Sequence, residues 1–303
     1  MSDRVVVTMS GGVADVRMNR PEKLNALDPA MFQALAETAA ELARDRSLRA
    51  AVLSGEGRAF CAGLDFASFQ ALANSPAASE ATRSPEAFRQ RPQSGRAQRG
   101  EAERSRQTRD SSASNGLLAR DESGSPANFA QRAAWAWTEL PVPVIAAVHG
   151  VAYGGGLQIA LGADLRLVAP DARLSVMEIK WGLVPDMSGT QTLRRLVRLD
   201  VAKELAYTGR VVSGAEAVAL GLATRAVDTP REAALELARE IAAKSPDAIR
   251  AAKRLLDASG LVDVAEGLRL EEELQRSLIG RPNQAEAVRA NVEKREPKFS
   301  DPS

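Results

Sequence analysis

Short apolar runs alternate with stretches of helical periodicity along the first part of the chain. Residues 5–9 and 13–18 are valine-rich runs separated by a Ser-Gly-Gly turn, a pattern that predicts a β-hairpin. Residues 29–44 place apolar side chains at helical intervals, and the apolar run at residues 49–54 predicts a further strand. This alternation of strands and helices favours an α/β fold with a parallel sheet.

The alternation continues in the second half of the chain and ends before the C-terminus. Residues 141–148 form a continuous apolar run, as expected for a central strand of a parallel sheet. The last predicted strand covers residues 222–227, and from residue 230 onward the pattern is helical. We therefore expect an α/β core over residues 1–227 and a helical C-terminal region over residues 228–303.

Residues 74–128 interrupt this pattern. The stretch is rich in Ser, Arg, Glu, Gln, Gly and Pro, and Phe88 is its only aromatic residue. Such a composition buries too little apolar surface to offset the entropy of ordering, so we predict a largely disordered insertion. Because the arginines alternate with acids, a basic anion-binding arm is the weaker interpretation. Helical periodicity returns at residues 129–140.

The composition excludes several classes of protein. The chain carries 40 basic and 39 acidic residues, so its overall charge gives no indication of a nucleic-acid partner. Its one cysteine, Cys61, and one histidine, His149, exclude a disulfide framework and a Cys- or His-rich metal site. No apolar run reaches the roughly 18 residues of a membrane span, and no signal peptide is indicated. We expect a cytoplasmic protein without a membrane partner.

Two glycine-bearing turns carry the candidate chemistry. Residues 58–65 (RAFCAGLD) follow a predicted strand, and residues 149–156 (HGVAYGGG) lie between a predicted strand and a helix. Glycines allow a ligand to approach the main chain closely, and unpaired N–H groups at such a turn suit an oxyanion or a phosphate. The spacing matches neither a dinucleotide-binding fingerprint nor a P-loop. Taken alone, either turn is more often a packing turn than a catalytic one.

Taken together and in order, these segments resemble the crotonase superfamily, the enoyl-CoA hydratase/isomerase family. The matching segments are residues 20–27 (RPEKLNAL), 59–65 (AFCAGLD), 147–156 (AVHGVAYGGG), 163–166 (ADLR), 182–185 (GLVP), 189–191 (GTQ) and 292–295 (VEKR). The resemblance covers the chain apart from residues 74–128. It implies an α/β core of ββα turns arranged as a spiral, followed by a helical C-terminal region that mediates trimerisation. A homotrimer or homohexamer is therefore expected.

The resemblance also implies how an acyl-CoA thioester would bind. In the family, two backbone N–H groups form an oxyanion hole for the thioester enolate, and the matching residues here are Leu64 and Gly155. Backbone around Ala62, Leu64 and Phe66 would receive the adenine–pantetheine part of CoA. Lys294 matches a lysine that reaches CoA, often from a neighbouring subunit; the alternative is a solvated lysine at a helix end. CoA enters as part of the substrate, and no metal or redox cofactor is implied.

The residues at the acid–base positions decide which reaction is run. Hydratases of the family carry two glutamates, and the matching positions here hold Gln158 and Glu178. A glutamine can orient a water, but it cannot accept a proton as a carboxylate does. By resemblance, single-glutamate enoyl-CoA isomerases use only the carboxylate at the Glu178 position. We therefore predict double-bond isomerisation, with enoyl-CoA hydration in fatty-acid β-oxidation as the main alternative; dehalogenase and thioesterase chemistry stay open.

A third polar residue, Asp186, falls where the dienoyl-CoA isomerase branch carries an aspartate. Its alternative role is the N-cap of a helix predicted from residue 188. Gln158 could equally be a first-turn helix residue with no part in catalysis, and Glu178 a surface acid before a loop. A protein that binds acyl-CoA without turnover is the competing class of function, suggested by Gln158. Two retained acids, Glu178 and Asp186, favour an enzyme.

Overall fold

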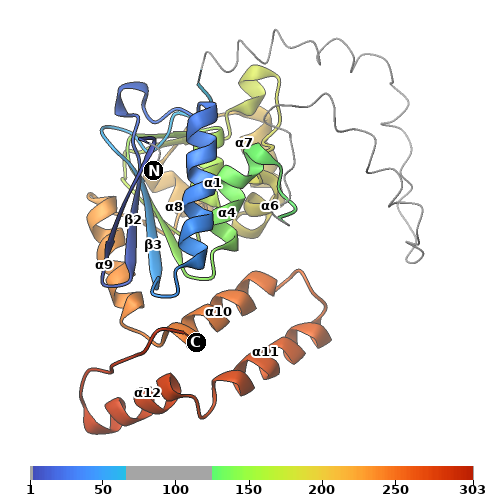
Figure 1. Cartoon of the computed structure of the whole chain (residues 1–303). Helices are drawn as coiled ribbons and strands as arrows, with labels where there is room; N and C mark the ends of the chain where they lie inside the picture. The colour runs from blue at the N-terminus through green and yellow to red at the C-terminus, as the bar shows by residue number, and fades with distance from the viewer. Residues whose placement is uncertain (1–2, 66–124, 303) are drawn as a thin grey trace, which may run out of the picture.

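The computed structural model describes residues 3–65 and 125–302 (Figure 1). The strands are β1 (Val5–Ser10), β2 (Val13–Met18), β3 (Ala50–Gly55), β4 (Val144–Val148), β5 (Val151–Tyr153), β6 (Leu165–Val168), β7 (Arg173–Ser175), β8 (Val212–Ser213) and β9 (Arg225–Ala226). The helices are the 3-10 helix η1 (Pro21–Lys23), α1 (Pro29–Arg44), α4 (Phe129–Glu139), α5 (Gly155–Leu161), the 3-10 helix η4 (Glu178–Trp181), α6 (Gly189–Leu196), α7 (Leu199–Thr208), α8 (Gly214–Leu220), α9 (Pro230–Ala242), α10 (Pro246–Ala258), α11 (Val264–Leu278) and α12 (Pro282–Glu293). The predicted α/β fold class is confirmed.

The larger sheet has the strand order β1-β2-β3-β4-β6-β9, and a smaller one has the order β5-β7-β8. The predicted hairpin is present, since β1 and β2 pair antiparallel with Val5 opposite Met18. From β2 to β9 every neighbouring pair in the larger sheet is parallel. All residues of β3 and β4 are buried, as the continuous apolar runs predict for strands covered on both faces.

The two faces of the larger sheet are covered by different helices. Ala51 and Leu53 of β3 belong to the cluster that packs beneath α1 and α4. Val52, on the opposite face, packs with Ala234 and Ala238 of α9. This split follows from the alternation of side chains along a strand. The helix α9, which the sequence assigns to the C-terminal region, thus packs against the core sheet.

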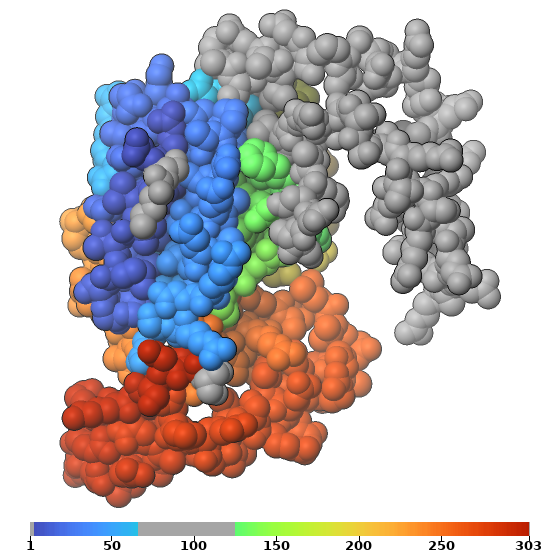
Figure 2. Space-filling model, in the orientation of Figure 1, coloured from blue at the N-terminus to red at the C-terminus, as the bar shows by residue number. Residues whose placement is uncertain are grey.

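The helices α10 to α12 form a separate layer below the sheet, and the space-filling view gives the same separation (Figures 1 and 2). Large apolar side chains are exposed on this layer; they are Leu256, Leu261, Val262, Val264, Leu268, Ile279, Val288 and Val292. In the part of the chain described, none of the helices has both the length and the apolarity needed to cross a membrane.

Some local elements differ from those the sequence predicts. The segment 149–156, predicted as a turn, contains the short strand β5, whose parallel pairing with β7 is a tertiary contact that no local pattern signals. Residues 74–124 of the predicted insertion lie outside the described residues. Residues 125–128 are described and lead into α4: the Asn128 side chain accepts a hydrogen bond from the Gln131 N–H, and the Gln131 side-chain Oε1 accepts one from the Asn128 N–H.

Candidate active site

The first glycine turn lies alongside the segment at residues 24–27. The Ala62 N–H donates to the Leu24 carbonyl (2.9 Å), the Leu27 N–H to the Gly63 carbonyl (2.8 Å), and the Asp65 N–H to the Leu27 carbonyl (2.9 Å). This is a parallel bridge between Leu27 and Leu64. In such a bridge, Leu64 directs its own N–H away from residues 24–27. Among the described residues, no acceptor for the Leu64 N–H is present.

The second glycine turn joins β5 to α5. Gly154 adopts a φ of 51°, a left-handed conformation that glycine accepts readily, and its N–H donates to the Ser175 carbonyl (2.9 Å). Gly155 is the first residue of α5, so its N–H has no carbonyl four residues earlier within the helix. Within residues 3–65 and 125–302, the Gly155 N–H donates to no other group either.

The two turns touch through their glycines. A Cβ added to Gly156 would lie 2.4 Å from the Cys61 carbonyl oxygen, which no side chain tolerates. A Cβ on Gly63 would lie 2.6 Å from the Tyr153 carbonyl oxygen and 3.7 Å from the Gly155 nitrogen. The absence of side chains at these positions therefore brings the Leu64 and Gly155 N–H groups into one small region.

A buried carboxylate lies beside this region. Glu178 is 8% exposed at the start of η4, and a Cβ on Gly154 would lie 3.3 Å from its Oε1. Oε1 accepts a hydrogen bond from Gln158 Nε2 (2.6 Å), whereas the buried Oε2 has no partner among the described groups. Burial is the main cause that raises the pKa of Glu178; the Gln158 hydrogen bond opposes it and the Asp186 charge adds to it. The carboxylate thus has one oxygen held and one available.

Gln158 connects this carboxylate to the loop before α6. Its side-chain Oε1 accepts hydrogen bonds from the Met187 N–H (2.8 Å) and the Gly189 N–H (2.9 Å). Because only the amide oxygen can accept from two N–H groups, the NH₂ end must face Glu178. The structure therefore brings Gln158 and Glu178 together, with the amide acting as a donor to the carboxylate.

Asp186 lies in the same loop, but it does not cap a helix. The N-cap of α6 is Ser188, and no side chain makes a cap hydrogen bond there, so the alternative role as an N-cap is wrong. The Asp186 side chain is largely exposed, yet partial desolvation by the surrounding chain raises its pKa. Its charge is close enough to raise the pKa of Glu178 as well.

Of the three residues expected to contact CoA, the structure describes Ala62 and Lys294. Ala62 is half-buried at the first turn, and its N–H is already bonded to the Leu24 carbonyl. Phe66 lies outside the described residues. Lys294 is exposed and directly follows α12, a helix of the layer below the sheet (Figure 1). Within the described ranges, no group of three or more His, Cys, Asp and Glu side chains could hold a metal ion.

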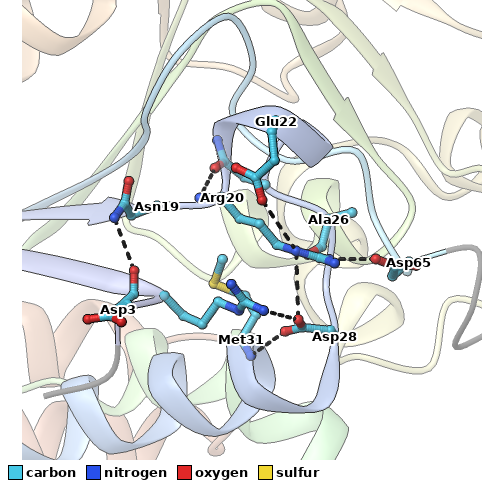
Figure 3. A network of polar contacts seen from close by, with 10 residues as sticks. Asp3, Asn19, Arg20, Glu22, Ala26, Asp28, Met31 and Asp65 are labelled. Atoms are coloured by element: carbon cyan, nitrogen blue, oxygen red, sulfur yellow. Dashed lines mark hydrogen bonds and ion pairs between the residues drawn. The ribbon is translucent and has the colours of Figure 1, made fainter.

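The sequence did not single out a polar network that supports the first turn (Figure 3). Arg20 Nη1 donates to Asp65 Oδ2 (2.5 Å) and to the Ala26 carbonyl (3.1 Å). Arg20 Nε lies 3.7 Å from Asp28 Oδ2, and Arg4 pairs with the same carboxylate (2.7 Å). Residues 20–27 form one of the motifs of the family resemblance. The contact of Arg20 with Asp65 is a tertiary contact, so the sequence alone could not predict it.

The two backbone N–H groups and the buried Glu178 carboxylate are suited to proton transfer next to a carbonyl group. Two unpartnered N–H groups can polarise a carbonyl oxygen, and a buried carboxylate beside them can move a proton at a neighbouring carbon. A raised pKa helps, since a stronger base removes a carbon-bound proton more readily.

Known proteins share this architecture. The sequence profile of the family described as "Enoyl-CoA hydratase/isomerase" matches residues 8–90 and 118–302. The chain is 35% identical over 298 residues to the mitochondrial enoyl-CoA hydratase domain-containing protein 2 of Bos taurus, covering 95% of this chain and 84% of that protein. It is 39% identical over 166 residues to the mitochondrial methylglutaconyl-CoA hydratase of Mus musculus, covering 53% of each. The crystal structure of an enoyl-CoA hydratase from Bacillus anthracis has a TM-score of 0.77 at 28% identity, covering 99% of this chain and 100% of that one.

Proposed function

The chain belongs to the enoyl-CoA hydratase/isomerase family, and from this premise we propose that it shifts the double bond of an enoyl-CoA thioester. Membership of the crotonase superfamily and the crotonase fold, both expected from the sequence motifs, are confirmed by the family profile and the solved relatives. A hydratase/isomerase-type enzyme is therefore established at the level of the family. The choice of isomerisation is our proposal.

The observation that carries this choice is the contact between Gln158 and Glu178. Gln158 Nε2 donates to Glu178 at 2.6 Å, and the Gln158 Oε1 is held by two backbone N–H groups. Position 158 thus offers no second carboxylate to share the activation of a water. Glu178 Oε2 is the oxygen left to exchange a proton. One base suffices for isomerisation, because the proton removed from one carbon is returned to another.

The proposed reaction begins with a 3-enoyl-CoA. The Leu64 and Gly155 N–H groups donate to the thioester carbonyl oxygen, and Glu178 Oε2 removes a proton from C2. The electron pair of that C–H bond moves into the thioester, giving an enolate that the two donors stabilise. Removing one donor of this kind typically costs about 3–4 kcal/mol. Glu178 then returns the proton to C4: the electrons of the C3–C4 double bond form the new C–H bond, the enolate electrons re-form the carbonyl and a C2–C3 double bond, and 2-enoyl-CoA leaves.

The CoA part of the substrate is proposed to lie along the first turn. The backbone at Ala62 and Phe66 would receive the adenine–pantetheine part. Lys294 would reach CoA from a neighbouring chain of a homotrimer or homohexamer, since one chain keeps it in the layer below the sheet. No metal or redox group takes part in the proposed steps, because coenzyme A arrives with the substrate.

Hydration is the second candidate function, favoured by Asp186. Its charge acts on Glu178, so a second acid does stand near the base. Several relatives are also named hydratases. A water held between Glu178 and Asp186 would add to C3 of a 2-enoyl-CoA. Binding without turnover is disfavoured, because a carboxylate kept buried with a raised pKa serves proton transfer better than ligand binding.

Product analysis tests the proposal. Purified protein is incubated with 3-enoyl-CoA and, separately, with 2-enoyl-CoA, and the products are resolved by mass spectrometry and NMR. We expect interconversion of the two, reduced by roughly 10²–10⁴-fold in Glu178→Gln. The control is Glu37→Gln on the exposed face of α1, which should leave the rate unchanged. A 3-hydroxyacyl-CoA product would establish the hydratase instead, and no conversion would favour a binding protein.

A further inference from the structure

The ion pair between Arg20 and Asp65 lies next to one of the two proposed carbonyl donors. We propose that this pair is a positioning device for the Leu64 N–H, so that Arg20 acts on the reaction without touching the substrate. The inference rests on the proposed use of Leu64 as an oxyanion donor. It assigns a role to two charged residues that take no part in the proton transfer.

Backbone hydrogen bonds hold the peptide groups on both sides of Leu64. Leu27 accepts from the Asp65 N–H and donates to the Gly63 carbonyl, so the peptide groups on either side of Leu64 are bonded to one residue. The Asp65 side chain is then held by Arg20 Nη1 at 2.5 Å. The same Nη1 donates to the Ala26 carbonyl at 3.1 Å, which ties the ion pair to the segment that carries Leu27. Rotation of the Gly63–Leu64 peptide group, which carries the Leu64 N–H, would break its bond to Leu27, and the bonds of Asp65 hold the residue that follows.

The segment that holds the first turn is itself strained. Leu24 and Asn25 have φ values of 51° and 56°, a region that residues with side chains rarely occupy. The fully buried Asn25 side chain maintains this conformation: it accepts from the Arg20 N–H (2.8 Å) and donates to the Glu56 (2.9 Å) and Ala59 (2.8 Å) carbonyls. Such strain persists only where the surroundings fix the backbone, as expected for a template that orients a catalytic donor.

The ion pair between Arg20 and Asp65 is largely shielded from solvent, so its attraction can help to hold the first turn in place. The Arg20 and Asp65 side chains are 12% and 14% exposed, so solvent and salt weaken their attraction less than that of a surface pair. Figure 3 shows the Arg20 guanidinium pointing between Asp28 and Asp65, with dashed contacts to both. A charged side chain with several partners resists displacement more than one with a single contact.

Two conservative variants test the proposal. Asp65→Asn keeps the shape of the side chain but removes its charge, and Arg20→Lys keeps the charge but loses the fork of donors. We expect kcat for isomerisation to fall roughly 10–100-fold in each, because a small misplacement of a donor is costly in the transition state. The dissociation constant of butyryl-CoA, a saturated thioester that cannot isomerise, should change less than about threefold, since a donor used mainly in the transition state contributes little to ground-state binding.

A direct readout separates positioning from simple destabilisation. The carbonyl stretch of bound butyryl-CoA labelled with ¹³C at C1 should shift to lower frequency in the wild type, because the N–H groups polarise the bond. We expect a smaller shift in both variants. In the double variant, the loss of kcat should be less than the product of the single losses, because both substitutions break one contact.

The matched control is Asp15→Asn. Asp15 pairs with Arg231 at 2.5 Å, the same length as the Arg20–Asp65 pair, and the two side chains are 12% and 37% exposed; this pair joins β2 to α9 away from the turns. This variant should lose some stability while keeping kcat and the carbonyl shift. An unchanged shift in Asp65→Asn, or an equal fall of kcat in Asp15→Asn, would overturn the positioning role. If the wild type fails to isomerise but its carbonyl shift still depends on Asp65, the proposed function fails while the positioning role stands.

Discussion

The two turns that supply the N–H groups are held in place by different means. The first, at residues 58–65, is held by backbone bonds to residues 24–27 and by the charged and polar side chains of Arg20 and Asn25. The second, at residues 149–156, is fixed by close packing, because its glycines lie against the backbone of the first turn and against Met187. One half of the proposed oxyanion hole should therefore be sensitive to charge, and the other to added volume.

The difference follows from where each turn lies. The second turn contains β5 and leads into α5, and these regular elements fix its backbone. The first turn contains no strand; its backbone pairs through two isolated bridges, Cys61 with Ala152 and Leu64 with Leu27. The side chains of Arg20 and Asn25 add to the backbone bonds of these bridges.

The largest effect should come from added volume in the second turn. In Gly156→Ala the new methyl group would lie 2.4 Å from the Cys61 carbonyl oxygen, so the turns must separate. We expect kcat to fall at least about 10³-fold, because the donors no longer converge. Overpacking should also lower the free energy of unfolding by roughly 1–3 kcal/mol.

Steady-state kinetics and thermal unfolding measure both effects. The control is Gly267→Ala on α11, where the added methyl group meets only Val262 at 3.8 Å. That variant should keep full activity and gain about 0.5–1 kcal/mol of stability, since alanine favours a helix. Full activity in Gly156→Ala would contradict the view that packing fixes the second turn.

A new charge beside the second turn should have the next largest effect. In Gln158→Glu the carboxylate can still accept from the Met187 and Gly189 N–H groups, but its other oxygen faces Glu178. Two carboxylates this close share a proton, so the pKa of the pair rises and less free base exists at pH 7. We expect roughly 10-fold or greater loss of isomerisation at pH 7 and a pH–rate profile displaced toward alkaline pH.

The matched control for this charge is Gln33→Glu. Gln33 donates to Glu37 at 2.8 Å on the exposed face of α1, the solvent-exposed counterpart of the buried pair. The like charges there should lower stability by only about 0.2–0.5 kcal/mol and leave the pH–rate profile unchanged. An unshifted profile in Gln158→Glu would show that position 158 has no electrostatic influence on the base.

A smaller effect is the pH dependence of stability that Glu178, buried beside the second turn, should cause. Because burial raises the pKa of Glu178 above its ordinary value of 4.5, the folded protein binds a proton that the unfolded chain has released. Stability from this group therefore falls as the pH rises from 4.5 through the raised pKa. Glu178→Gln should then unfold at a higher temperature than the wild type at pH 8, and the difference should disappear below pH 4.5. Scanning calorimetry across this range checks the sign, and an equal or lower unfolding temperature for the variant at pH 8 would contradict it.

The smallest effect should come from Lys294, which is exposed at the end of α12. If it reaches CoA from a neighbouring chain, Lys294→Ala should raise KM about two- to fivefold and leave kcat unchanged, as for an exposed ion pair. The exposed Lys298, close by in the chain, supplies the control as Lys298→Ala. Initial rates at several salt concentrations measure the effect. A loss of kcat in Lys294→Ala would contradict a role limited to binding CoA.

Much of the fold could be predicted from local pattern. The hairpin, the fully buried β3 and β4 and most helices follow from periodicity and turn residues. The placement of α9 on the sheet could not, because its buried Ala234, Ala238 and Ala242 give a face of small residues that looks weakly apolar in sequence. Because α9 lies close to the sheet, small side chains such as alanine fill the space between them.

The candidate site also has one part that the sequence predicts and one part that it does not. Leu64, Gly155 and Glu178 lie in short motifs whose spacing the sequence displays. The role of Gln158 depends on the Met187 and Gly189 N–H groups, 29 and 31 residues away, and Arg20 meets Asp65 at a separation of 45 residues. Contacts over such separations arise from tertiary packing, so no local pattern predicts which donor will face which carboxylate.

The central claim is that one carboxylate, Glu178, both removes and returns the proton. The most direct test uses 3-enoyl-CoA carrying deuterium at C2, converted in ordinary water, with the label located in the product by NMR at early times. Because Glu178 is 8% exposed, it should exchange its hydron with water slowly, and we predict that part of the deuterium appears at C4 of 2-enoyl-CoA. Complete loss of the label to water, or a 3-hydroxyacyl-CoA as the product, would contradict a single buried base.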